Sequence, residues 1–312
     1  MGGAFGAASY ASRLSSGDTA AHPVEPFFRG LGHFAITRHD TLWYAAGRFT
    51  LVTFPNNRPV ACTKREVQRL LVDCGKLVAV FCPLAGSGVR VAEHRLPAGD
   101  YGPGRMQEQF RRHVRKHASA FVSRALEWDE MATAAGPIHA DTAARRGNPL
   151  PALTDHVRWK AVCATAAGIG GLEAYGCLLG DRLAAYVVSW QERDVCHGVL
   201  INRDGAFDAR RVANVLLHAF SVDRTGRADI AEVNLGRGWY PPRPGLDSFK
   251  RHAGYEQRET TLAVVLHPRL EWLLASSLTH RFLRTIAWLA GGRLNVESDL
   301  QLFETARLTE IA

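Results

Sequence analysis

The pattern of apolar and polar positions is clearest in the C-terminal half of the chain. Residues 177–190 form two apolar runs joined by Gly180-Asp181, a pair typical of a tight turn between neighbouring strands. The apolar residues of the stretch 206–220 recur instead with helical spacing, and Arg210 and Arg211 lie off that apolar face. With further short apolar runs, the predicted order is strand, strand, strand, helix, strand, helix, strand, over residues 177–190, 196–201, 206–220, 230–235, 247–252 and 261–266.

The N-terminal half has a related pattern. Residues 33–95 contain strand-like apolar runs around one helix at 64–73. The segment 136–151 is polar, contains Gly and Pro and is expected to be a loop, so we place a domain boundary near it. Further helices are expected over residues 104–122, 125–135, 155–167 and 268–290.

Composition narrows the class of protein only a little. The chain has 312 residues, of which 46% are hydrophobic and 22% charged, as in ordinary globular proteins. The formal net charge is +8 and nearly all of the basic residues are arginines. A positive balance favours anionic partners such as tRNA, nucleotide phosphates or an acidic membrane face, but the charge alone does not select one of them.

The six cysteines show neither a C-x-x-C pair nor a spacing suited to zinc. We therefore expect a reducing cytoplasm and no structural metal. The first 26 residues lack the basic start and apolar core of a secretory signal and are expected to form a loose tail. Glu271, Arg281 and Arg284 interrupt the apolar helix at 268–290, which argues against a membrane span and for packing on the protein core.

Three short motifs occur in a defined order along the chain. Leu235-Gly236 is followed by Leu246-Asp247-Ser248-Phe249-Lys250-Arg251-His252-Ala253-Gly254, which resembles the leucine-glycine, phenylalanine-lysine and glycine signature of the FemABX-like transferases. The stretch Thr142–Gly147 resembles the family's threonine and arginine-glycine turn, and residues 109–118 resemble its basic helix. The resemblance covers roughly residues 30 to 270.

This resemblance implies an α+β fold of two tandem GNAT-like domains, each a mixed twisted sheet flanked by helices. The corresponding division is a tail at 1–26, a first domain at 27–137, a second domain at 138–268 and a C-terminal helix at 269–312 that packs back on the first domain. Members of the family move aminoacyl or acyl groups onto amines.

Several sequence motifs of other enzyme classes do not occur in the chain. It contains no phosphate-binding loop of nucleotide hydrolases, no G-x-S-x-G nucleophile elbow and no H-E-x-x-H zinc motif. The segment 200–207 contains one glycine and lacks the R/Q-x-x-G-x-G/A loop with which ordinary GNAT acetyltransferases hold the diphosphate of coenzyme A. This argues against acetyl-CoA, and we expect no cofactor.

Lys250 is the first candidate for catalysis. The resemblance places this lysine beside the reacting carbonyl, where an ammonium group would stabilise the tetrahedral intermediate; alternatively it is a surface lysine. Asp247 and Glu232 could act as a base, and nothing in the sequence selects either. The resemblance also suggests that Arg146, with Arg145 beside it, meets an acceptor phosphate, while both arginines also suit an exposed loop.

Three aromatic residues are candidates for lining a substrate pocket. Tyr186 and Trp190 have the same parity on one strand and could line an acyl or acceptor pocket, or pack in the core. Phe249 is the motif neighbour of Lys250 and suits the core better.

The helix predicted at 104–122 carries a basic face. Arg111, Arg112, Arg115 and Lys116 lie on one arc, which is either a solvated helix face or a platform for tRNA phosphates.

These observations favour an aminoacyltransferase that forms an amide bond between a tRNA-borne amino acid and an amine of a peptide, a peptidoglycan-type precursor or a peptide-antibiotic precursor. One alternative is an N-acyltransferase that uses acyl-CoA or an acyl carrier protein. The other is a non-catalytic GNAT scaffold that binds RNA or a partner.

Overall fold

The computed structural model describes residues 20–86, 88–99, 101–146, 150–237, 244–275 and 306. Up to residue 97 the elements are α1 (Glu25–Gly30), β1 (Ala35–Arg38), β2 (Thr41–Ala45), β3 (Thr50–Phe54), β4 (Pro59–Val60), α2 (Lys64–Cys74), β5 (Val78–Pro83) and β6 (Val89–Pro97). They are followed by α3 (Glu108–His117), β7 (Val122–Leu126), α4 (Trp128–Ala134), α5 (Gly136–Arg146), α6 (Pro151–Thr154) and α7 (His156–Ala167).

The remaining elements form the C-terminal half. They are β8 (Leu172–Leu179), β9 (Arg182–Glu192), β10 (Val195–Arg203), a 3-10 helix (Gly205–Arg210), α8 (Val212–Thr225), β11 (Glu232–Arg237), α9 (Pro244–His252), β12 (Glu256–Leu266) and α10 (Pro268–Ala275). The order predicted from the apolar pattern of residues 177–266 is confirmed, as is the turn at Gly180, whose φ is +59°.

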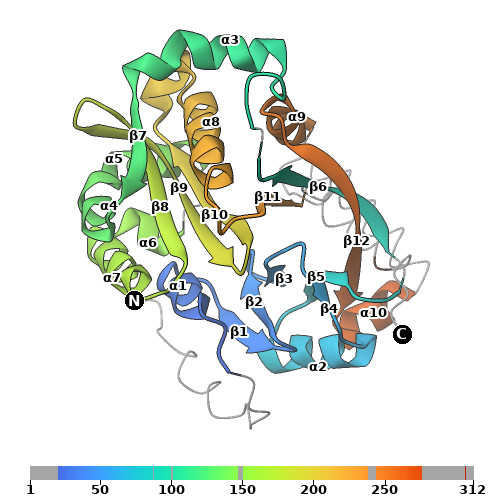
Figure 1. Cartoon of the computed structure of the whole chain (residues 1–312). Coiled ribbons are helices and arrows are strands. Elements are labelled where there is room, and N and C mark those ends of the chain that lie inside the picture. The colour runs from blue at the N-terminus through green and yellow to red at the C-terminus, as the bar shows by residue number, and fades with distance from the viewer. Residues whose placement is uncertain are drawn as a thin grey trace, which may run out of the picture.

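The described strands form one mixed sheet, in the order β1-β2-β3-β5-β12-β6-β11-β10-β9-β8-β7, with β4 beside β5 (Figure 1). The long strand β12 joins its two parts, because residues 256–262 pair with β6 and residues 263–266 pair with β5. The pairs β3–β5, β4–β5 and β10–β11 are parallel and the others are antiparallel. The α+β class and the mixed, helix-flanked sheet are therefore confirmed.

Strand pairing crosses the predicted domain boundary at residue 137. β6 and β7 precede this boundary, yet β6 pairs with β11 and β7 pairs with β8. The start of the C-terminal helix contacts α2, where Glu271 accepts from Lys64 Nζ at 2.5 Å and from Gln68 Nε2 at 2.6 Å. The rest of the predicted helix at 269–312 lies outside the described residues, apart from residue 306. The division into tandem domains remains a prediction.

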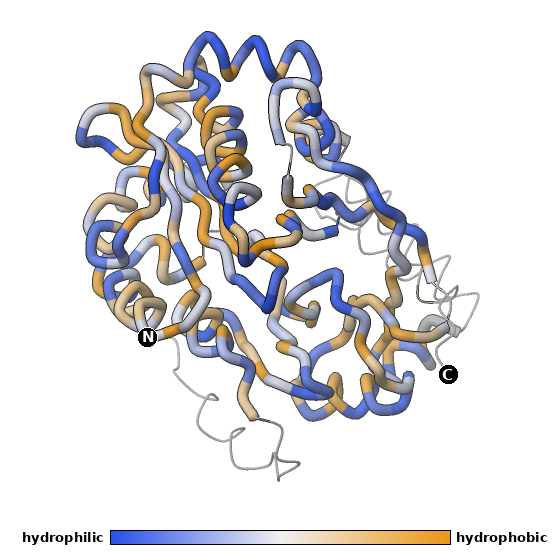
Figure 2. The backbone as a smooth tube through the Cα atoms, in the orientation of Figure 1, coloured by the Kyte–Doolittle hydropathy of each residue, from blue (hydrophilic) through white to orange (hydrophobic). Residues whose placement is uncertain are grey.

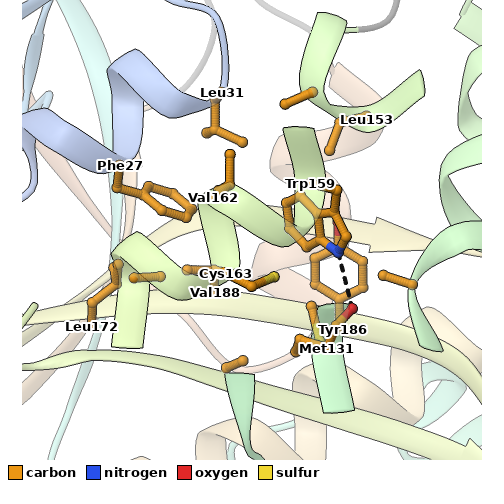
Figure 3. Close-up of a cluster of buried hydrophobic side chains, with 14 of the residues drawn as sticks. Phe27, Leu31, Met131, Leu153, Trp159, Val162, Cys163, Leu172, Tyr186 and Val188 are labelled. Carbon is orange, nitrogen blue, oxygen red and sulfur yellow. Dashed lines mark hydrogen bonds between the residues drawn. The ribbon is translucent and has the colours of Figure 1, made fainter. Parts of the chain in front are cut away.

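Helices cover both faces of the strands β8 to β10. Tyr186, Val188 and Trp190 of β9 face α1, α4, α6 and α7, while Ala185 and Val187 face α3 and α8. Figure 3 shows the first of these cores, in which Trp159 donates from Nε1 to the Met131 carbonyl at 2.9 Å. Successive side chains of a strand point to opposite faces of the sheet, so the apolar residues of β9 contribute to the hydrophobic cores on both faces.

Two elements differ from the sequence-based expectation. Residues 136–146, expected to be a loop, form α5, because proline suits the first turn of a helix and alanines favour the turns after it. Residues 122–126, where one expected helix ends and the next begins, form β7, because pairing with β8 outweighs local propensity at this sheet edge.

The helix α2 has local signals at both ends. The Glu66 backbone N–H donates to the hydroxyl oxygen of Thr63, and the Thr63 backbone N–H donates to the Glu66 carboxylate. These two reciprocal bonds form a capping box. Gly75 follows the helix with φ of +62°, a conformation that glycine adopts without strain. These signals explain why α2 was predicted to within one residue.

We expect Thr63→Ala to lower the free energy of unfolding by about 1 kcal/mol, because it removes the side-chain oxygen that caps α2. Urea denaturation measures the change. Thr63→Ser keeps a capping hydroxyl and is the matched control, so an equal loss in both variants would contradict the assignment of this energy to the cap.

Candidate functional site

The pairing of two parallel strands stops in the middle of the sheet. β10 and β11 pair over residues 195–197 and 232–234, although β10 continues to Arg203 and β11 to Arg237. Beyond this point, the register of β10 against β9 shifts between Gly198 and Leu200. The register of β11 against β6 shifts as well, between Asn234 and Arg237. Near the centre of the sheet, the residues that follow 197 on β10 and 234 on β11 therefore no longer pair with each other.

A cavity lies where the two strands separate. It has about 360 Å³ of empty space, including the part open to solvent. His197 and Gly198 of β10 form part of its lining, and Asn234 and Gly236 of β11 form another part. The N-terminal half contributes aromatic and amide side chains, among them Tyr44, Phe54 and Asn56. The site thus combines residues that are far apart in the sequence.

Lys250 of α9 approaches β11 at the same level. It is 7% exposed, and its Nζ donates to the Leu235 carbonyl at 2.9 Å. Leu235 lies between Asn234 and Gly236, which line the cavity. Burial lowers the pKa of Lys250 to about 8, against the opposing effect of the Asp247 carboxylate. An ammonium group next to an opened strand can bind a developing oxyanion; its catalytic role remains a prediction.

His94 lies beside Lys250 and was missed in the sequence. It is fully buried on β6, and its Nε2 is 3.8 Å from Asp247 Oδ1. Burial, together with the charge of Lys250, lowers the pKa of His94 to about 4, against the opposing effect of Asp247. Single histidines in apolar strands are common in cores, so the sequence carried no signal for this contact.

His197 was missed for the same reason, although it lines the cavity directly. Burial lowers its pKa to about 4, with contributions from Arg95, Arg58 and His22. Its ring stacks on that of Trp190 with centroids 6.2 Å apart. His197 is therefore a neutral group at neutral pH and can donate or accept a hydrogen bond with a substrate.

The three predicted aromatic residues have different surroundings. Trp190 is buried behind the cavity, with its ring 5.8 Å from that of Phe54. Tyr186 is fully buried in the core, where its hydroxyl is hydrogen-bonded to His139 Nε2 at 2.7 Å and accepts from Asn202 Nδ2 at 2.9 Å. Phe249 packs on Phe110 with ring centroids 5.9 Å apart.

Arg145 lies in α5, away from the opening between β10 and β11. It pairs with Asp141 at 2.6 Å and donates to the Arg203 carbonyl at 2.9 Å. Arg203 ends β10, four residues beyond Val199, which lines the cavity. Arg146 is the last residue of α5, and its side chain lies outside the described part of the chain.

The predicted basic face lies on α3, a strongly hydrophilic helix at one edge of the molecule (Figure 2). Arg111 and Arg115 both pair with Glu108 on the same helix. Arg112 and Lys116 are exposed. Burial lowers the pKa of the nearby His113, and so do the charges of Arg211, Arg112, His117 and Lys116. The face therefore retains a group of cations, which extends to the start of α8.

The segment before α8 has its amides already engaged. Gly205 N donates to Asp141 Oδ2 at 3.0 Å, and Ala206 N donates to Asp204 Oδ1 at 2.9 Å. Phe207 N donates to the Asp204 carbonyl at 3.1 Å. A diphosphate needs free amides, and the carboxylates of Asp141 and Asp204 would repel it.

The described residues contain no group of three or more His, Cys, Asp or Glu residues placed to hold a metal ion. Within the same residues, no helix is both long and apolar enough to cross a membrane.

Residues 104–251 match the family model described as an acetyltransferase (GNAT) domain. Comparison with curated proteins gives no match. Among solved structures, FemX superposes with a TM-score of 0.53 at 9% identity, over 86% of this chain and 97% of FemX.

Two further structures show the same fold. One is the C-terminal domain of a putative lysylphosphatidylglycerol synthetase from Agrobacterium fabrum, with a TM-score of 0.51 at 10% identity, over 78% of this chain and 87% of that domain. The other is L-PGS from Bacillus licheniformis, with a TM-score of 0.51 at 12% identity, over 78% of this chain and 88% of that one. The chain thus has the fold of FemX, and its residues 104–251 match a GNAT acetyltransferase domain. Both findings agree with the resemblance to the FemABX-like transferases and with the expected class of acyl- or aminoacyltransferase.

Proposed function

We propose that this protein forms amide bonds by moving an aminoacyl group from tRNA to an amine of a peptide, a peptidoglycan-type precursor or a peptide-antibiotic precursor. The observation that carries the proposal is the buried ammonium group of Lys250 against β11, where this strand leaves β10 and borders the cavity. A tRNA donor also implies that the reaction takes place in the cytoplasm.

In the proposed reaction, the neutral amine attacks the carbonyl of the aminoacyl ester. A carbon–nitrogen bond forms and the ester carbon–oxygen bond breaks. The amine proton passes to the leaving ribose oxygen of the tRNA, which becomes a hydroxyl. The ammonium group of Lys250 has three N–H groups, one of which donates to the Leu235 carbonyl. We propose that a second N–H group of Lys250 donates to the carbonyl oxygen and stabilises the negative charge that develops there.

Two observations favour tRNA as the donor over coenzyme A. The amides of residues 205–207 are bonded within the fold, so the usual diphosphate cradle is occupied. The exposed Arg112 and Lys116, with Arg211 close by, offer charges to a polyanionic backbone. An aminoacyl ester is already activated, so this reaction needs no nucleotide site.

The second candidate is N-acyl transfer from a thioester on CoA or a carrier protein. The match of residues 104–251 to an acetyltransferase domain favours it. A scaffold that binds RNA or a partner without catalysis is the third reading, and loss of activity on substitution of Lys250 would exclude it.

We expect bulk aminoacylated tRNA to bind with a steep dependence on salt, because phosphate contacts release counterions. Fluorescence anisotropy at low and moderate salt measures this, with acetyl-CoA and longer acyl-CoAs as competitors. Displacement by CoA esters, together with weak binding of tRNA, would instead make thioester-dependent acylation the better account.

A further inference from the structure

Arg237 ends β11 next to the cavity. It follows Gly236, which lines the cavity, and its backbone N–H donates at 3.2 Å to Asn56 Oδ1, another lining residue. Its guanidinium lies within electrostatic range of Tyr44, which also lines the cavity, and of Cys82 on β5. The side chain thus lies between β11 and the N-terminal part of the sheet, next to residues that line the cavity.

This guanidinium has no carboxylate partner among the described residues. Its Nη1 is buried without a hydrogen bond, and the groups that favour its charge are Cys82 and Tyr44. Neither of these is ionised at neutral pH, because burial raises the pKa of both. The carboxylate opposite it on β6, that of Glu93, is engaged by Arg95 at 2.7 Å and by Asn234 at 2.6 Å. Burial lowers the pKa of Arg237, which shows that its charge is poorly compensated.

Other arginines near the sheet are paired within the fold. The buried Arg224 binds Glu173, and the partly exposed Arg58 binds Glu192 at 2.8 Å. A buried charge without a partner is costly, and proteins keep such groups where a ligand supplies the partner. Arg237 therefore stands apart from the structural ion pairs of this protein.

No Asp or Glu is among the described residues that line the cavity. The arginines whose charges act on His197 are paired, because Arg95 binds Glu93 at 2.7 Å and Arg58 binds Glu192 at 2.8 Å. The guanidinium of Arg237 is therefore the charge beside the lining that a carboxylate of a ligand could neutralise.

We infer that Arg237 binds a carboxylate of the amine-bearing acceptor, so that the acceptor is an amino acid or peptide with its carboxylate close to its reacting amine. The inference rests on the proposed function and specifies its acceptor. A guanidinium matches the two oxygens of a carboxylate in a bidentate pair. The positive charge of Arg237 also lowers the pKa of the acceptor's ammonium group, which favours the neutral amine that the reaction requires.

Binding of glycylglycine and of glycylglycinamide tests the inference, because the two probes differ in the terminal carboxylate alone. Calorimetry at low salt should show glycylglycine binding about tenfold or more tightly than the amide, and Arg237→Met should remove this difference. Arg90→Met is the matched control, since Arg90 is exposed and pairs with the exposed Glu259. Inorganic phosphate forms a separate arm, which distinguishes a carboxylate site from a general anion site.

The stability of the ligand-free protein gives a second readout. Arg237→Met should leave the urea midpoint unchanged or raise it, while Arg224→Met should lower it, because Arg224 leaves Glu173 without its partner. Equal binding of both probes, no binding of either by the wild type, tighter binding of phosphate than of glycylglycine, or a loss of stability in Arg237→Met as large as in Arg224→Met would each overturn the inference. None of these measurements depends on transfer activity, so they can fail independently of the proposed function.

Discussion

Lys250→Met should lower the rate of transfer by about 100- to 1,000-fold, the usual effect of losing one donor to an oxyanion. Methionine is similar in length and apolar, so it fills the same space without an ammonium group. The turnover number should carry most of the loss, because Lys250 is assigned to the charge that develops during the reaction. Steady-state kinetics with aminoacylated tRNA and an amine acceptor measure the effect.

The exposed Lys160 on α7 provides the control for this variant. Lys160→Met should retain wild-type turnover, and both variants should keep the circular dichroism of the folded protein. Turnover of Lys250→Met close to that of the wild type would remove Lys250 from the site. It would also favour the two alternatives, a non-catalytic scaffold or an enzyme whose active site does not include Lys250.

The pH profile provides a further signature of Lys250 in the same experiment. Burial lowers its pKa from 10.5 to about 8, so the ammonium form is lost as the pH rises through about 8. Activity that depends on this ammonium should fall on that limb. Between pH 8 and 10.5 the unfolded chain binds more protons at this lysine than the folded one, so its contribution to stability rises with pH over that window.

Reversing the charge of Arg112 and Lys116 together should weaken tRNA binding by about 10- to 100-fold at low salt and reduce the slope of log K against log salt by about 1.4 to 1.8, the loss of two phosphate contacts. These two residues are chosen because they are exposed, whereas Arg111 and Arg115 pair with Glu108. The structure therefore divides the predicted cationic face into free and paired members. Anisotropy titrations at several salt concentrations measure both quantities.

Arg65 and Arg69 on α2 allow a matched control, because they are also exposed and four residues apart. Their reversal to glutamate changes the net charge equally but on another part of the molecule. A similar loss of affinity in both double variants would show that net charge, rather than the surface of α3, attracts tRNA. Unchanged binding in the α3 variant would leave α3 as a solvated helix face.

Much of the fold was accessible from the sequence because its signals are local. The apolar runs on either side of Gly180-Asp181 predict the β8–β9 hairpin, and the capping box of α2 fixes the start of that helix. The expectation failed at β7 and α5, where the composition is mixed and neighbouring elements decide. β7 is a strand because β8 lies beside it, which its own residues do not reveal.

The candidate site was accessible only in part. Lys250 came from the rarity of lysine in the chain and from a motif, and α3 came from its density of basic residues. His94, His197 and Arg237 carry no comparable signal, because the two histidines are notable for their burial and Arg237 for its buried, unpaired Nη1, and not for their neighbours in sequence. For Tyr186 the sequence left a pocket and the core open, and the structure places its hydroxyl in hydrogen bonds within the core.

By itself, then, the sequence determined most of the elements and their order, apart from β7 and α5, and the positions of the basic helix and of Lys250. These depend on residue periodicity, turn residues and charge density over short stretches. Only the tertiary structure decided that β10 and β11 separate beside Lys250 and that residues 54–57 close the cavity from the other half of the chain. It alone decided that Nη1 of Arg237 is buried without a hydrogen bond and that this arginine has no carboxylate partner among the described residues. Desolvation and pairing of a charge depend on atoms contributed by distant segments, and no local pattern encodes them.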